Sequence, residues 1–360
     1  MLISRRSRRF LLLSLLLLVA VIRFVPDAGE LSATWVYPEL SLALSFLASL
    51  LPYSLEEWIV ILSLLLVLLY PLVALCFGRR LKRILLGEGE WLAWIVAWFY
   101  LGWGCNYFRH DFYRRLMLQP ATFEKADFTV FLQEYTDSLN AAFTKVEHID
   151  AAATLKEIQD IYRSVPSGYG LTRPQTFQQP KPVLFNDLYN GVGVLGYMGP
   201  FMCESQLNMD LLPVEYPFVL AHETAHLLGV SSEAESNFWA YCVCQHSDVP
   251  EIRYSGLFSL LPYVWRNALT VLTPEEVKRW KNSVNPEIFE ALNVQRQYWM
   301  AKENPVVNRV QETLYNWFLK GNRIESGTKN YNEVVGMLMA VRENHEEPLR
   351  RQGRRLSVKQ

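Results

Sequence analysis

Residues 216–229 read Tyr-Pro-Phe-Val-Leu-Ala-His-Glu-Thr-Ala-His-Leu-Leu-Gly, and they predict the element around which the chain is organised. The pattern His-Glu-x-x-His separates His222 and His226 by four residues, so on a helix both imidazoles project from one face. Two imidazoles at this spacing can hold one Zn²⁺ ion. Glu223 would then lie beside a water molecule at the metal and could accept its proton.

The flanking residues favour a buried helix. Pro217 suits a first helical turn, and Gly229 can end the helix in a left-handed turn. The alternative is a pair of ordinary histidines without a metal. That alternative would have to provide partners for three buried polar groups, which is costly. An inactive protein that keeps the same helix would show the same pattern.

The next segment offers two candidates for a third ligand, Glu233 and Glu235. Ser232 with Glu235 has the form of a capping box, which would occupy Glu235 with backbone and leave Glu233 free to reach the metal. Asn237 follows Glu233 by one turn and could steady the ligands. Glu235 stays open as the alternative ligand because a helix start is uncertain by a residue or two.

This arrangement of motifs resembles the gluzincin pattern of zinc metallopeptidases, in which His-Glu-x-x-His is followed by Glu-x-x-x-Asp or Asn on a second helix. The resemblance implies that Glu233 is the third ligand. Position 237 is Asn where many gluzincins have Asp. The interval from His226 to Glu233 is also shorter than is usual in them.

Most of the chain is similar to a bacterial membrane-protein family known mainly as a domain of unknown function. The similarity rests on a Trp-Gly-x-Asn-Tyr-x-Arg segment at residues 103–109 and on the segment 222–241. It implies a membrane-anchored, zincin-like domain with a gluzincin-type His-Glu-x-x-His motif, and it implies no substrate.

Composition points to a membrane protein and away from nucleic acid. The chain has 360 residues, 51% of them hydrophobic, and a formal net charge of −1. The charge balance gives no reason to expect a nucleic-acid partner. The apolar excess is concentrated near the N-terminus, which is typical of a membrane anchor and makes the lipid bilayer a partner.

Three apolar stretches predict membrane spans, and they cover residues 10–25, 55–77 and 91–107. A cleaved signal peptide is the alternative for the first stretch. Residues 40–51 are apolar but brief, so we expect an interfacial or re-entrant segment there.

Basic residues predict the orientation in the cytoplasmic membrane. Arg5–Arg9 and Arg79–Arg83 flank the spans on one side, whereas residues 27–54 contain no Lys or Arg. The basic side should be cytoplasmic, with the N-terminus inside and the chain after Arg109 outside.

The predicted fold class is α+β, mainly α. We expect a membrane anchor over residues 1–109, a zincin-like metallopeptidase domain over 110–345 and a basic disordered tail over 346–360. Expected elements of the second domain are helices at 128–146 and 151–164, a loop at 171–182, and strand and turn at 183–195.

Two further expectations concern the flanks of the motif. In zincins an edge strand precedes the metal helix and pairs with extended substrate, and by this analogy residues 200–208 are either that edge strand or an internal strand without a special role. From residue 274 onward the chain predicts helices, among them 305–319 and 330–341. His246, Arg253, Tyr254 and Tyr263 could each stabilise an oxyanion, but nothing in their spacing selects one.

These features predict a membrane-anchored, zinc-dependent metallopeptidase that hydrolyses peptide or protein substrates. Zinc on His222, His226 and Glu233 would polarise the scissile carbonyl, with Glu223 as general base. The alternative is a non-catalytic binding or scaffold protein with a structural zinc site. Four protein ligands would favour the scaffold, and three ligands plus water would favour the enzyme.

Overall fold

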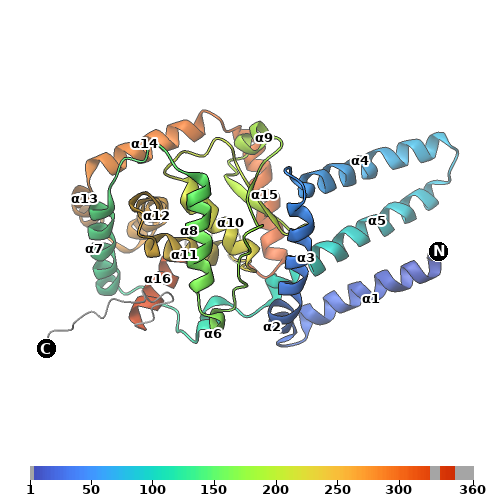
Figure 1. Ribbon diagram of the computed structural model, residues 1–360, viewed down its shortest axis with the longest axis horizontal. Helices are drawn as coiled ribbons and strands as arrows, with labels where there is room; N and C mark the ends of the chain where they lie inside the picture. Colours follow the sequence, from blue (N-terminus) through green and yellow to red (C-terminus); the bar gives the residue numbers. More distant parts are fainter. Residues whose placement is uncertain (1–3, 325–332, 345–360) are drawn as a thin grey trace. The chain divides into compact units, whose positions relative to one another are not determined.

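The computed structural model describes residues 4–324 and 333–344, which are mostly helical with one small three-stranded sheet (Figure 1). The mainly helical α+β class predicted from the sequence is therefore confirmed. The chain divides into two units. The first contains the N-terminal residues up to His110 together with 177–186 and 196–209, and the second contains 111–176, 187–195 and the chain from Asp210 onward.

Apolar helices make up most of the first unit: α1 (Arg5–Phe24), α2 (Ala28–Leu31), the π-helical η1 (Ser32–Val36), α3 (Tyr37–Ser49), α4 (Leu55–Cys76), α5 (Leu81–Gly102) and the 3₁₀-helical η2 (Gly104–Phe108). Among the described residues, α4 and α5 are each long and apolar enough to cross a membrane. Helix α1 is a candidate span only together with Ala28–Ser49. The bend of 117° between them marks a broken span or a re-entrant loop. Residues 4–324 and 333–344 thus contain two candidate spans, or three if the bent pair is one span.

The helix that carries most of the last predicted span, 91–107, has different bounds. Helix α5 begins at Leu81 and ends at Gly102, and residues 104–108 turn as a separate 3₁₀ helix. Glu90 lies inside this helix, just before the predicted start of the span, and its charge is compensated. Its carboxylate accepts from Arg8 at 2.6 Å and from Arg9 at 3.0 Å. The helix therefore continues through this charge.

The Trp-Gly-x-Asn-Tyr-x-Arg segment forms the connection at the end of α5. Trp103 is its buried first residue, and the next five residues form η2. Arg109 donates to Glu30 Oε1 at 3.0 Å, and the backbone N–H of His110 donates to Glu30 Oε2 at 3.0 Å. The segment thereby ties the end of α5 to α2.

The sheet has the strand order β1-β3-β2. Strand β1 (Lys181–Pro182) runs parallel to β3 (Glu204–Leu207), and β2 (Gly196–Gly199) runs antiparallel to it. Lys181 lies opposite Gln206, and Gly199 lies opposite Glu204. The edge-strand role considered for residues 200–208 is wrong, because β3 is the central strand and both of its edges are already paired.

A buried ion pair joins the sheet to the start of α4 within the first unit. Lys181 donates to Glu204 Oε2 at 2.5 Å, and Glu204 Oε1 accepts from Ser54 Oγ at 2.9 Å and from the backbone N–H of Glu56 at 2.7 Å. The side chains of Lys181 and Glu204 are only 10% and 4% exposed. Each charge is therefore compensated by the other in a site that is nearly shielded from water.

Glu204→Ala is expected to lower the free energy of unfolding by about 3–5 kcal/mol, because it leaves Lys181 buried without its carboxylate. Thermal unfolding of the full-length protein in detergent measures the loss. Glu90→Ala is the control: its partners Arg8 and Arg9 are half exposed, so at most about 1 kcal/mol should be lost. Equal losses of stability in the two variants would show that the buried Lys181–Glu204 ion pair contributes no more than the more exposed one at Glu90.

The second unit is a helical body. Its elements are α6 (Phe112–Leu116), α7 (Lys125–Ala142), α8 (Ala151–Ser164), η3 (Ser167–Tyr169), α9 (Asn186–Gly191), α10 (Tyr216–Leu227), α11 (Glu233–His246), α12 (Pro250–Val271), α13 (Pro274–Ser283), α14 (Pro286–Met300), α15 (Pro305–Gly321) and α16 (Val334–Glu343). Helices α10, α11 and α12 pack together at its centre, α7 packs on α12, and α8 packs on α10 and α11 (Figure 1). The largest fully buried side chain is Trp239 of α11.

Local sequence accounts for many of these helix starts. A proline stands in the first turn of α10, α12, α13, α14 and α15, where its missing N–H is not needed. The helices predicted near 128–146 and 151–164 are confirmed as α7 and α8. The strand expected within 183–195 is wrong: residues 186–191 form α9, where Asn190 donates to Asp210 at 2.7 Å. The predicted basic tail and residues 330–332 lie outside the described residues.

Candidate metal centre

The central helix α10 carries the two histidines. Pro217 lies in its first turn, and the chain leaves the helix through Gly229, whose φ of 98° is unfavourable for residues with a side chain. Within α10, His222 and His226 lie one turn apart with ring centroids separated by 4.7 Å. The helix therefore presents both imidazoles from one face.

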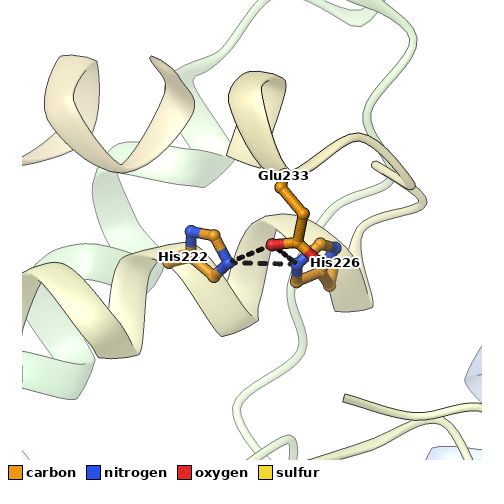
Figure 2. A group of neighbouring side chains, drawn as sticks. All are labelled: His222, His226 and Glu233. Carbon is orange, nitrogen blue, oxygen red and sulfur yellow. Dashed lines mark hydrogen bonds and ion pairs between the residues drawn. The ribbon is translucent and has the colours of Figure 1, made fainter. Parts of the chain in front are cut away.

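The short turn after Gly229 returns the chain directly to this face. Ser232 caps helix α11, its hydroxyl accepting from the backbone N–H of Glu235, and Glu233 is the first residue of that helix. Figure 2 shows the carboxylate of Glu233 pointing at the two imidazoles. Three residues that are at most eleven positions apart in the sequence thus converge from two helices.

The distances between the three donor atoms fit a metal site. Nε2 of His222 lies 3.1 Å from Nε2 of His226 and 3.1 Å from Oε2 of Glu233, and the remaining separation is 3.4 Å. Donors each about 2.05 Å from a tetrahedral zinc ion would lie ~3.3 Å apart. In the described part of the chain these three residues form the one cluster of three or more His, Cys, Asp or Glu ligands. The donor set therefore fits zinc in both type and spacing.

The opposite edge of each imidazole is fixed by a hydrogen bond. Nδ1 of His226 lies 2.8 Å from the carbonyl of Val230, which can only accept, so Nδ1 carries the proton. Nδ1 of His222 lies 2.8 Å from Oδ1 of Asn237. In the neutral imidazole that a metal requires, a proton on Nδ1 would leave the lone pair of each Nε2 for the ion. Asn237 thus contacts His222 on the side away from the cluster.

Glu235 lies elsewhere. Its carboxylate forms a buried ion pair with Arg115 of α6 and accepts from Nε1 of Trp239 at 3.1 Å. The side chains of Glu235 and Arg115 are each 5% exposed. Of the two carboxylates considered as third ligand, only Glu233 belongs to the cluster. The capping-box pattern predicts a backbone partner for Glu235, whereas Arg115 is 120 residues away and has no local signal in the sequence.

Tyr315 of α15 is the residue that sequence reasoning missed. Its hydroxyl donates to Oε1 of Glu233 at 2.5 Å. The other carboxylate oxygen, Oε2, is the one that lies near the two histidines. This bond orients the Glu233 carboxylate and leaves Oε2 for the cluster. Tyr315 is 82 residues from Glu233, and no motif surrounds it, so no local sequence signal could have found it.

Glu223 lies next to the cluster and is buried. Within the described residues its Oε2 has no hydrogen-bond partner. Burial raises the pKa of Glu223, and the two neighbouring histidines oppose that rise. A buried carboxylate with one uncommitted oxygen and a raised pKa is suited to accepting a proton and releasing it again.

Charge coupling within the cluster is strong in the metal-free protein. Burial alone would lower the pKa of His226, but the Glu233 carboxylate raises it to about 9. Burial opposes ionisation of Glu233 too, yet His226 and His222 hold its pKa well below the usual range. Below about pH 9 the metal-free protein therefore carries an imidazolium and carboxylate pair where the metal would lie.

This coupling predicts the pH dependence of zinc binding. A raised pKa means that the His226–Glu233 pair stabilises the metal-free fold fully below about pH 6.5 and that the effect is lost as the pH rises through about 9. A zinc ion that bound here would have to displace that proton, so its affinity should rise about tenfold per pH unit from 6.5 toward 9. Competition titrations against a zinc chelator at pH 6.5, 7.5 and 8.5 measure the slope. An affinity independent of pH would refute the protonated state.

Of the four residues considered for oxyanion stabilisation, Tyr263 lies near this cluster. Burial raises the pKa of Tyr263, the Asn237 amide opposes the rise and the Glu233 carboxylate adds to it. His246 instead lies against the carbonyl of Cys242, and Tyr254 packs on Phe143. The surroundings of the cluster thus include two tyrosines, Tyr263 and Tyr315.

The chain is similar to a known protein family. A family model described as a protein of unknown function, DUF3810, matches residues 33–339. The chain belongs to the DUF3810 family. No curated protein and no solved structure matches it.

The DUF3810 match runs from η1 into α16 and so includes both motif helices, Tyr315 and the Trp103–Arg109 segment. The resemblance to an uncharacterised family is thereby confirmed. The family description names no activity, so a function for this DUF3810 member has to be argued from its own residues.

Proposed function

We propose that this DUF3810 member is a membrane-anchored, zinc-dependent peptidase with a gluzincin-like arrangement of ligands. The observation that carries the proposal is the convergence of His222, His226 and Glu233, with donor separations of 3.1, 3.1 and 3.4 Å. Each imidazole also has its other nitrogen tied to an acceptor, which supports a role as metal ligand.

Zinc held by these three donors would lower the pKa of a water molecule and polarise a peptide carbonyl. Glu223 would take one proton from that water as its oxygen attacks the carbonyl carbon. The same carboxyl would then give the proton to the leaving amine as the carbon–nitrogen bond breaks. Burial raises the pKa of Glu223 toward neutral pH, which favours this shuttle because the carboxyl can then both accept and release the proton.

The tyrosines have supporting roles in this proposal. The hydrogen bond from Tyr315 to Glu233 Oε1 holds the carboxylate in the orientation that points Oε2 at the histidines. Asn237 fixes the ring of His222, and Tyr263 lies beside Asn237. These contacts preorganise the ligands, which is what a second layer of hydrogen bonds does in metal sites.

The number of ligands favours an enzyme over a scaffold with structural zinc. Structural zinc sites normally have four protein ligands, whereas catalytic sites have three and an open position. Within residues 4–324 and 333–344, no fourth His, Cys, Asp or Glu joins the cluster. An uncommitted carboxylate oxygen on Glu223 beside the cluster further supports chemistry at this site.

The proposed location is the cytoplasmic membrane, with the catalytic unit outside. Basic residues at 5–9 and 79–83 favour the cytoplasmic side for those segments. The chain after Arg109 would then lie outside the cytoplasm, where the substrate would be a peptide or an unfolded protein segment.

Peptide cleavage by full-length protein in lipid nanodiscs tests the function. A fluorogenic peptide library should be cleaved, cleavage should stop after chelation, and about one equivalent of zinc per chain should restore it. Protein that binds zinc and cleaves no member of the library would instead support the scaffold. Cleavage that survives complete removal of the metal would refute a metallopeptidase.

A further inference from the structure

Helix α15 (Pro305–Gly321) exposes more of its large apolar side chains than an ordinary surface helix does. Leu319 is its one buried residue. Large apolar side chains face outward instead: Val306 is 73% exposed, Val310 56%, Leu314 57% and Trp317 68%. A surface helix normally turns such residues toward the core and its charges toward water.

The two faces of α15 are separate. At about 100° per residue, Val306, Val310, Leu314 and Trp317 fall within an arc of roughly 80°, and Val307 extends it to about 100°. Tyr315 and Leu319 lie on the other side of the helix, and they are the residues that face the body of the second unit: Leu319 is buried and Tyr315 contacts Glu233. The apolar arc is therefore continuous and points away from the body.

Contacts at the start and in the middle of the helix hold it in this rotation. At its start, the side chain of Asn304 caps the helix, and the backbone N–H of Asn304 donates to the carbonyl of Gly191 at 2.9 Å. In the middle, Tyr315 donates to Glu233 at 2.5 Å. Turning the apolar face inward would break the bond to Glu233, so its exposure is a consequence of how α15 is anchored.

We propose that the apolar face of α15, formed by Val306, Val307, Val310, Leu314 and Trp317, lies in the surface of the lipid bilayer that the chain's own helices cross. The proposal goes beyond the peptidase and does not depend on bound metal. An exposed apolar face of this extent marks an interaction site. The same chain carries α4 and α5, which are long and apolar enough to cross a membrane, so a bilayer is always near.

The chemistry of α15 fits a bilayer surface in particular. Trp is enriched at the boundary between headgroups and acyl chains, and Trp317 is the most exposed aromatic residue of the helix. Arg309 and Lys320 border one edge of the apolar arc, where basic side chains can reach lipid phosphates. Glu312 lies about 140° from Trp317 around the axis, outside the apolar arc and on the far side from the lipid.

Fluorescence quenching in nanodiscs tests this placement on the full-length protein. Cys76, the exposed cysteine, is replaced by Ser, and a bimane label is attached to Val310→Cys or, as the matched control two residues away, to Glu312→Cys. Nanodiscs contain phosphatidylcholine with phosphatidylglycerol and a nitroxide-labelled lipid. Lipid nitroxide should quench the label at 310 several-fold more than at 312, and aqueous iodide should show the reverse order.

Equal iodide quenching at both positions would overturn the proposal, because the face would then be in water. Protection of position 310 from both quenchers would also overturn it, since a second copy, another protein or another segment of the chain would then cover the face. If Val310→Cys does not fold, Leu314→Cys reports on the same arc. Loss of peptidase activity has no bearing on this readout, so the two proposals fail independently.

Discussion

Glu223→Gln is expected to reduce peptide hydrolysis by a factor of about 10³ while zinc stays bound. A general base contributes roughly 10²–10⁴-fold to such a reaction, and glutamine cannot accept the proton. The substitution keeps the size of a buried side chain that lies next to the cluster and outside it. Turnover of the best library peptide and zinc content per chain, measured on the same preparation, check both parts.

Glu235→Gln is a suitable control for that measurement, because Glu235 is equally buried but pairs with Arg115. It should retain most of the activity. Unchanged turnover in Glu223→Gln would show that Glu223 is not the base. Loss of zinc from Glu223→Gln would show that this residue holds the site together and would leave its part in proton transfer unsupported.

Glu233→Gln is expected to weaken zinc binding on the order of 10³-fold, whereas Glu235→Gln should change it little. In the proposed site three ligands would share the binding free energy of the ion, and replacing the one anionic donor would remove a large part of it. The two variants delete one carboxylate charge each, two positions apart on the same helix. Zinc affinities from competition with a chelator at one fixed pH compare them directly.

For stability the two variants should rank in the reverse order: Glu235→Gln should lose more than Glu233→Gln. Glu235→Gln removes the charge that compensates the buried guanidinium of Arg115, so its melting temperature should fall. Glu233→Gln removes a charge that in the metal-free protein is compensated by the titratable His226. Weaker zinc binding in Glu235→Gln than in Glu233→Gln would contradict the ligand set.

Sequence reasoning reached the local part of the site because its determinants are local. The four-residue spacing of His222 and His226 fixes their shared face on any helix, and Glu233 follows after one short turn. The choice between Glu233 and Glu235 stayed open in the sequence, since it depends on Arg115, which comes from α6. Tyr315 also comes from a distant helix, and spacing along the chain carries no information about it.

The fold was predictable where periodicity and length are decisive. Helices α7 and α8 follow from their apolar patterns, and α4 follows from an uninterrupted apolar stretch. Helix α5 begins at Leu81, before the predicted span, and Glu90 in this earlier part pairs with Arg8 and Arg9, which are distant in the sequence. The choice between an edge strand and an internal strand for residues 200–208 stayed open in the sequence, because β1 is only two residues long and has no strand pattern of its own.

Zinc-edge X-ray absorption on the full-length protein tests the central claim most directly. We predict a four-coordinate shell of nitrogen and oxygen at about 2.0–2.1 Å, with outer scattering from two imidazoles. His226→Ala should lose one imidazole contribution or the ion itself. A sulfur shell near 2.3 Å, or an ion without imidazole ligands, would contradict the account.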